Sequence, residues 1–268
     1  MVKETISEVG HGYYECLYKK ANTLNSQDAY DPAMKQIDLD LTRTLPHNKN
    51  FEDLNASKIE SLRRVLYAYR WHNTDIGYCQ GLNRLAAVAL LYLNEEDAFW
   101  TLVAIVEYLQ PKDYYGHTML AAQADQRVLR DFVVDKMPKV SSHLKALEVD
   151  LSLFTFNWFL TIFVDSFVHS TYLNIWDSFL YEGNKVLFRF ALAILKINEN
   201  EIIACKSSSA LHSCLSNLGE NSINFEKLSQ VAFKDMNPFP SKQIESKRAH
   251  HLIQLKVEID NMNNQRER

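Results

Sequence analysis

Apolar residues in this chain recur mainly at intervals of three and four, which is the period of an α-helix. Ile59, Leu62, Leu66 and Tyr69 follow this spacing, and a second apolar series occupies residues 82–93. Strand signals are weak, because apolar and polar residues do not alternate cleanly and no Asn-Gly or Asp-Gly hairpin turn occurs. We therefore predict an all-α fold of many helices with short connections.

Individual residues predict where further helices begin and end. Asn94, Thr118 and Asn184 precede apolar helical patterns and are expected to cap them, whereas Pro138 is expected to interrupt one. Residues 154–168 are almost all apolar or aromatic, so we predict a helix there that is buried on most sides.

The two ends of the chain differ from its centre. Residues 1–12 are polar and are predicted to form a disordered extension, followed by a helical domain over residues 13–240. Residues 241–268 are charged and predict one further helix, whose apolar residues have coiled-coil spacing over only about two heptads. A coiled-coil stub and a peripheral helix lying on the domain both remain open. The residues with this spacing are Leu252, Leu255, Ile259 and Met262.

The amino-acid composition argues against several classes of protein. The 29 Lys and Arg against 33 Asp and Glu give a net charge of −4, without the basic surplus typical of nucleic-acid binders. Only 7 Gly and 6 Pro occur in 268 residues, which argues against a many-stranded sandwich or barrel. The four cysteines form no C-x-x-C pair and are expected to be free thiols. Without a signal peptide or a long apolar run, the protein is expected to be soluble and cytosolic.

Motifs for nucleotide, metal and nucleophile chemistry are also missing. The sequence contains no G-x-x-x-x-G-K-[ST], G-x-G-x-x-G, G-x-S-x-G or H-E-x-x-H, and no Cys/His cluster at zinc spacing. We expect neither a nucleotide site nor a metal site of its own. Cys79 lacks a partner at recognisable spacing and is interpreted as a partly buried small residue rather than a nucleophile.

Residues 37–46 form the first candidate segment. Asp40 and Arg43 are three residues apart, so on a helix they share a face and can pair. Pro46 disfavours helix at Leu45, so the helix is predicted to end just after Arg43, with its guanidinium near solvent. The same residues also fit a surface ion pair worth only a few tenths of a kcal/mol.

Residues 77–83 form the second candidate segment. Two of the seven glycines, Gly77 and Gly81, lie close to one glutamine, and an apolar helix follows. Gln80 is therefore predicted to project from a junction between loop and helix, where glycine permits unusual backbone angles. The alternative is a structural loop whose glutamine satisfies backbone groups.

Together the two segments indicate a reaction class. A guanidinium can neutralise charge on a transferring phosphoryl group, and a carboxamide can orient the attacking water. A slow GTPase needs such groups to be held in place, and an activating protein can supply them in trans, for a gain of about 10³–10⁵ in rate. A chain with no nucleotide site of its own fits this role.

At this point the residues resemble a known family. I-x-x-D-x-x-R-T-x-P and G-Y-x-Q-G-x-N, in this order, resemble the arginine-finger and glutamine-finger motifs of the TBC domain, the Rab GTPase-activating family. Residues 97–100 (D-A-F-W), 157–160 (N-W-F-L) and 175–183 (I-W-D-S-F-L-Y-E-G) match its later pattern. The resemblance covers about residues 13–240. It is strongest for the Armus-type subfamily, which carries a PH domain and a coiled coil upstream.

The resemblance implies an all-α, two-lobed domain with defined roles. Arg43 would neutralise transition-state charge, and Gln80 would position the water in place of the Rab's own glutamine. Asp40 would orient Arg43, and Tyr78 would support the loop. The remaining motif residues are expected to support the site or bind the partner, and these are Thr44, Gly81 and Asn83. The motif tryptophans are expected to lie in the core, and these are Trp100, Trp158 and Trp176.

The resemblance also implies a partner and a location. The partner would be a GTP-bound Rab in vesicle trafficking, with a late-endosomal one favoured, and GTP and magnesium would belong to that Rab. No nucleic acid and no transmembrane segment are expected. The protein would be cytoplasmic, peripheral to endosomal membranes through regions or partners outside this chain.

The sequence departs from the family's pattern at one point, and two other interpretations of its function remain open. The family's opening motif, an arginine and a tryptophan in the first helices, is absent before Tyr13, so we expect a domain shortened at its N-terminus. A non-catalytic Rab-binding adaptor with the same fold and an unrelated all-α scaffold both remain open.

Overall fold

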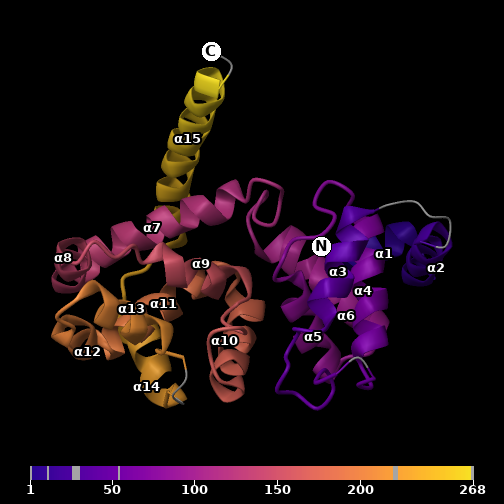
Figure 1. Ribbon diagram of the computed structural model, residues 1–268, viewed down its shortest axis with the longest axis horizontal. Helices are drawn as coiled ribbons and strands as arrows, with labels where there is room; N and C mark the ends of the chain where they lie inside the picture. Colours follow the sequence, from indigo (N-terminus) through magenta and orange to yellow (C-terminus); the bar gives the residue numbers. More distant parts are fainter. Residues whose placement is uncertain (1, 11, 26–30, 54, 220–222, 267–268) are drawn as a thin grey trace. The chain divides into compact units, whose positions relative to one another are not determined.

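The chain folds into helices joined by turns and loops (Figure 1). The structure is a computed structural model that describes residues 2–10, 12–25, 31–53, 55–219 and 223–266. Over these ranges it contains no β-strand, which confirms the predicted all-α class. The helices form two compact units, one ending at residue 117 and the other beginning at residue 118.

The first unit is built around one central helix. α4 packs against four other helices, and the apolar series predicted from the sequence is its buried face, from Ile59 through Leu62 and Leu66 to Tyr69. The elements of this unit are α1 (Val2–Val9), α2 (Tyr13–Asn25), α3 (Pro32–Leu41), α4 (Ile59–His72), α5 (Leu82–Tyr92), α6 (Glu95–Ala104) and the π-helical turn η1 (Ile105–Leu109).

The prediction of a disordered extension over residues 1–12 is wrong for residues 2–9, which form α1. This helix is attached to the unit, because the hydroxyl groups of Thr5 and Tyr108 are hydrogen-bonded at 2.6 Å. The polar composition of the segment concealed a helix that is stabilised by a residue far along the chain.

The predicted cap of α6 is confirmed, whereas the predicted end of α3 is slightly wrong. Asn94 caps α6 as predicted, because its side chain accepts a hydrogen bond from the backbone N–H of Asp97 at 2.9 Å. α3 ends at Leu41, two residues earlier than expected. Leu45 then adopts a left-handed φ of 47°, outside the right-handed helical region that the following proline disfavours.

The second unit is also organised by one helix. Ten consecutive residues of α11, from Val186 to Leu195, are buried. Its elements are α7 (Leu120–Lys136), α8 (Pro138–Ala146), α9 (Ser152–Leu160), α10 (His169–Glu182), α11 (Lys185–Ile197), α12 (Glu199–Ala204), α13 (Ser208–Ser216), α14 (Phe225–Gln230), the π-helical turn η2 (Val231–Asp235) and α15 (Ser241–Arg266). Pro138 separates α7 from α8, as predicted.

Residues 154–168 do not form the single helix that was predicted. α9 ends at Leu160, and Ile162 and Phe163 adopt positive φ angles of 50° and 65°. The indole N–H of Trp176 donates to the carbonyl oxygen of Ile162 at 3.1 Å and secures this turn. The apolar run predicted burial correctly, but burial alone does not require a continuous helix.

Two predicted caps are also wrong. α7 follows Met119, and Thr118 does not cap it with its side chain. Asn184 makes no capping hydrogen bond to α11, because its side-chain oxygen accepts from Arg248 of α15. Arg248 also pairs with the buried carboxylate of Asp125 on α7 through two hydrogen bonds of 2.5 and 3.1 Å.

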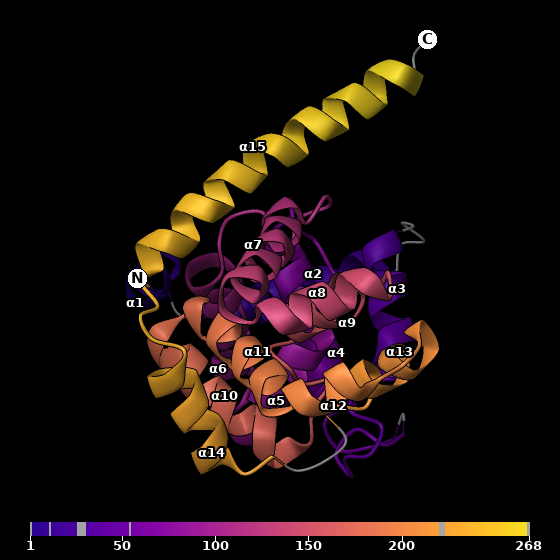
Figure 2. The ribbon, with the colours of Figure 1, turned by 90° about the vertical axis from the view of Figure 1, so that its left-hand side faces the viewer.

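The charged C-terminal segment forms one helix, α15 (Figure 2), which packs against α7. Arg127 pairs with Glu258 at 2.6 Å, and the imidazole of His251 is hydrogen-bonded to Asp131 at 2.8 Å. Met262, near the end of the coiled-coil spacing, is about half exposed. Of the two interpretations left open, these contacts favour a peripheral helix on the second unit for α15 as far as Glu258.

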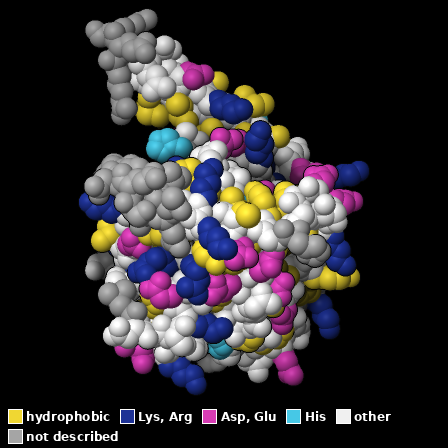
Figure 3. Space-filling model, turned by 90° about the vertical axis from the view of Figure 1, so that its right-hand side faces the viewer, with side chains coloured by type: hydrophobic (Ala, Val, Ile, Leu, Met, Phe, Trp, Pro, Cys, Tyr) yellow, Lys and Arg dark blue, Asp and Glu magenta, His cyan; other side chains and the backbone are white. Residues whose placement is uncertain are grey.

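The described surface carries no broad region of one charge in the view of Figure 3, where basic and acidic side chains are interspersed. This distribution agrees with the small net charge and with the absence of a basic stripe in the sequence. No helix in the described ranges combines the length and the apolar character needed to cross a bilayer.

Gly219 marks a close backbone approach in the second unit. A Cβ atom added there would lie 1.4 Å from the carbonyl oxygen of Ser166, so the backbone would have to move. We expect Gly219→Ala to lower the free energy of unfolding by about 3 kcal/mol, as for other overpacked sites. Urea unfolding measures this loss. Gly116→Ala is the matched control, since its added Cβ meets no atom closer than 3.7 Å. Equal stability of the two variants would contradict the prediction.

Candidate functional site

Arg43 lies just beyond α3, which is fastened to α4. Asp38 of α3 accepts hydrogen bonds from the Tyr67 hydroxyl at 2.9 Å and from the Arg63 guanidinium at 3.0 Å. The backbone N–H of Arg43 donates to the carbonyl oxygen of Asp40 at 3.2 Å, which continues the helical turn. The position of Arg43 is therefore set by a helix that is anchored to the core.

The guanidinium of Arg43 is exposed and its direction is fixed by a buried carboxylate. The Arg43 side chain is 55% exposed, whereas that of Asp40 is 1% exposed. Nε of Arg43 donates to Oδ1 of Asp40 at 2.9 Å, and Nη2 contacts the same oxygen. The predicted pairing is confirmed, and it leaves part of the guanidinium open to a partner.

Gln80 lies where the loop after α4 enters α5, as predicted. The Gln80 residue is exposed, and the nearby glycines adopt positive φ angles of 62° at Gly77 and 106° at Gly81. Residues with a Cβ atom rarely adopt such angles, so these two glycines let the loop turn sharply into the helix. This explains why a chain poor in glycine places two of them beside Gln80.

One carboxylate joins the two segments. Oδ2 of Asp40 accepts a hydrogen bond from the Tyr78 hydroxyl at 2.7 Å, while Oδ1 holds Arg43. Burial and the neighbouring Asp40 raise the pKa of Tyr78, so its hydroxyl stays protonated and can donate. Gln36 also donates to Oδ1, at 3.0 Å. Asp40 therefore connects Arg43 to the loop two residues before Gln80.

A second bridge runs beside the first. The Thr44 hydroxyl donates to the carbonyl oxygen of Asp40 at 2.6 Å and accepts from the Asn83 amide at 2.7 Å. The side-chain oxygen of Asn83 in turn accepts from the backbone N–H of Gly81 at 3.1 Å. Thr44 and Asn83 are buried, so their place is inside this bridge and not on a contact surface.

The remaining candidates have structural positions. Burial raises the pKa of the Cys79 thiol to about 11, so it is protonated at neutral pH and is not an activated nucleophile. Trp100, Trp158 and Trp176 are buried, as expected for core residues. Within the described ranges, no three His, Cys, Asp or Glu side chains gather into a group able to hold a metal ion.

Gln36 is the one member of the site that the sequence analysis missed. Its signal was present, because Gln36 and Asp40 are four residues apart on α3 and side chains at this spacing meet on a helix. The motif resemblance did not include this position, so the hydrogen bond from Gln36 to Asp40 was not expected.

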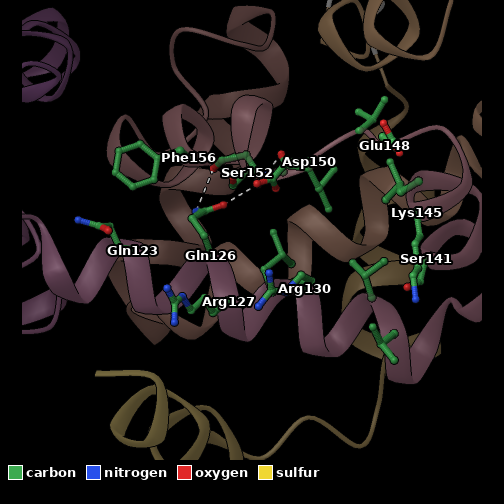
Figure 4. Close-up of a pocket in the computed structure, with 17 residues that line it drawn as sticks. Gln123, Gln126, Arg127, Arg130, Ser141, Lys145, Glu148, Asp150, Ser152 and Phe156 are labelled. Atoms are coloured by element: carbon green, nitrogen blue, oxygen red, sulfur yellow. Dashed lines mark hydrogen bonds between the residues drawn. The ribbon is translucent and has the colours of Figure 1, made fainter. Parts of the chain in front are cut away.

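A pocket of about 680 Å³ lies within the second unit, between α7, α8 and the start of α9 (Figure 4). Its lining mixes basic Lys145 with acidic Glu148 and Asp150. Gln126 is satisfied by Thr155, whose hydroxyl donates to it at 2.6 Å. None of the site residues predicted from the sequence lines this pocket.

Several known proteins are similar to this chain in sequence. A family model described as Rab-GTPase-TBC domain matches residues 8–203. Human TBC1 domain family member 2B is 50% identical over 248 residues, covering 92% of this chain and 25% of that protein. Human TBC1 domain family member 2A is 52% identical over 229 residues, covering 85% and 25%. This chain thus spans about a quarter of the length of these relatives.

Two solved structures resemble the fold. The Chlamydomonas flagellar RabGAP TBC domain has a TM-score of 0.75 and 29% identity, covering 87% of this chain and 75% of that one. The Ypt/Rab-GAP domain of Gyp1p has a TM-score of 0.56 and 19% identity, covering 94% and 84%. The second likeness concerns the fold alone.

Proposed function

This chain belongs to the Rab-GTPase-TBC domain family, and from that premise we propose that it accelerates GTP hydrolysis by a Rab-family GTPase. The observation that carries the proposal is the buried carboxylate of Asp40. It holds the exposed guanidinium of Arg43 on one oxygen and the loop of Gln80, through Tyr78, on the other.

The two exposed side chains would act on the partner's nucleotide. Charge spreads over the oxygens of the transferring phosphoryl group in the transition state, and the Arg43 guanidinium would neutralise it. The Gln80 carboxamide would orient the attacking water in place of the GTPase's own glutamine. GTP and magnesium would be supplied by the partner. The rigid bridges would reduce the entropy lost when both side chains enter the partner's site.

The proposed partner is a Rab in its GTP-bound state. Because the sequence is similar to the Armus-type subfamily, we propose an endosomal Rab, with a late-endosomal one favoured. The protein would then act in vesicle trafficking from the cytoplasm, reaching endosomal membranes through regions or partners outside this chain.

A non-catalytic adaptor is not favoured. Binding alone requires neither an exposed guanidinium nor an exposed carboxamide held by a shared network. Here Arg43 and Gln80 are both present and both exposed, and the supporting residues form two complete bridges.

A screen of single-turnover phosphate release over a panel of GTP-loaded Rabs tests the proposal. We expect at least one Rab to hydrolyse GTP about 10³–10⁵ times faster with this chain than alone, the range known for supply of an arginine in trans. Each Rab without the chain is the control. Binding to GTP-loaded Rabs with no acceleration on any of them would refute the proposed activity and favour an adaptor.

A further inference from the structure

The loop that carries Gln80 is anchored at its base as well as near its tip. Asn73 directly follows the last residue of α4, and its amide nitrogen donates to Oε1 of Glu107 at 2.9 Å. Its amide oxygen accepts from the backbone N–H of Ile76 at 3.1 Å, and its carbonyl oxygen accepts from that of Gly77 at 2.7 Å. One asparagine therefore links a carboxylate to the backbone of the loop.

Glu107 lies on η1, the π-helical turn that follows α6. Short π-helical segments inside α-helices are frequent at functional sites. Oε1 of Glu107 also lies 3.4 Å from Nε2 of His72 and accepts from the Tyr69 hydroxyl at 3.3 Å. One carboxylate oxygen of Glu107 thus contacts three side chains at the C-terminal end of α4, those of Tyr69, His72 and Asn73.

The surroundings of Glu107 favour its charged form. Burial would raise the pKa of Glu107, but hydrogen bonds from His72 and Asn73 outweigh burial and hold the pKa below its usual value. Hydrogen bonds to an ionised acceptor are about twice as strong as those between neutral groups. The charge therefore strengthens the link to Asn73.

His72 extends this anchor to the N-terminal helices. Nδ1 of His72 is hydrogen-bonded to the Tyr13 hydroxyl of α2 at 3.0 Å. The imidazole also packs edge-on against Phe99 and Trp100, with ring centroids 5.5 and 6.0 Å away. The packing of α2 and α6 thereby fixes the imidazole that contacts Oε1 of Glu107.

We propose that Glu107 is a positioning residue for Gln80, acting through Asn73 at the base of the loop. This inference rests on the proposed GTPase-activating function. Asp40 and Asn83 hold the loop close to Gln80, and Glu107 holds its other end. With both ends fixed, the exposed carboxamide is presented in one orientation. Loss of the base anchor slows the chemical step and leaves the binding of the Rab unchanged.

Glu107→Gln tests this inference, because it preserves the size of the side chain and removes its charge. In phosphate-release kinetics on a responsive Rab we expect kcat to fall about tenfold, equivalent to about 1.4 kcal/mol, with KM for the GTP-loaded Rab unchanged. Amide hydrogen exchange at Ile76 and Gly77 should be several-fold faster, and exchange in the second unit unchanged. Glu96→Gln, an exposed glutamate on α6, is the matched control.

A double-variant cycle separates positioning from a general structural effect. If Glu107 acts through Gln80, Glu107→Gln causes no further loss of rate when Gln80 is already alanine. Asn73→Ala removes the same link from the other side and should reproduce the fall in kcat. This second variant keeps the test valid if Glu107→Gln unfolds.

The failures of the two proposals are distinguishable. Unchanged exchange at Ile76 and Gly77, or an equal loss of rate with and without Gln80, overturns the role of Glu107 and leaves the GTPase-activating function standing. If the unaltered chain accelerates no Rab, the proposed function fails, and the role of Glu107 in catalysis fails with it.

Discussion

Arg43→Ala is expected to reduce the acceleration of Rab GTP hydrolysis by about 10³–10⁵, which is nearly all of it. The reason is electrostatic, because no other group described at this site presents an exposed cation fixed by a buried carboxylate next to the loop of Gln80. The effect corresponds to about 4–7 kcal/mol of barrier. Single-turnover phosphate release on a responsive Rab measures it directly.

Two further variants make the Arg43 result specific. Arg43→Lys keeps a positive charge beside the buried Asp40 but loses the planar fork, so we expect the fold to survive and the rate to stay far below normal. Arg127→Ala removes another arginine paired with a carboxylate, Glu258 of α15, and should leave the rate unchanged. Normal acceleration by Arg43→Ala would refute the arginine-finger mechanism.

Gln80→Ala is expected to lower the acceleration by about 10²–10³, as for the loss of one group that stabilises the reacting atoms. Gln80 is exposed at the end of the loop, whereas the backbone there is held by Gly81 and Asn83. Truncating the Gln80 side chain should therefore spare the fold. The same phosphate-release assay measures the loss, with KM recorded alongside.

The control for Gln80 is another exposed glutamine, Gln243 of α15, whose replacement by alanine should not alter the rate. A GTPase variant without its own glutamine provides the sharper test. The unaltered chain should still accelerate that GTPase, because Gln80 replaces the missing group, whereas Gln80→Ala should not. If the unaltered chain does not accelerate GTP hydrolysis by this GTPase variant, Gln80 does not position the water.

Much of the fold was predictable because it is local. The spacing of Ile59, Leu62, Leu66 and Tyr69 places them on one side of a helix, and that side is buried in the structure. Asn94 caps α6 because its partner is three residues away on the same chain segment. Such features depend on neighbours in sequence, so a pattern is enough to find them.

The errors occur where a distant residue competes with a local rule. Asn184 is a good capping residue, but Arg248 lies 64 positions later and takes its oxygen. The apolar run after Phe154 leaves the helix at Leu160, in a turn that Trp176 secures from another helix. The polar segment before Tyr13 folds into α1, which is attached through the hydroxyl of Tyr108.

The candidate site likewise has some features that the local sequence predicts and others that depend on distant residues. The local pattern placed Arg43 near the end of a helix and Gln80 close to two glycines, because helix geometry and backbone freedom act over a few residues. The roles expected for both residues came from the motif resemblance. The local pattern could not reveal that Asp40 holds both, since Tyr78 is 38 residues away. A buried carboxylate must find hydrogen-bond donors wherever the packed chain supplies them. Only the folding of α3 against α4 and α5 supplies Tyr78 there, so the tertiary structure decided how the two exposed side chains are held.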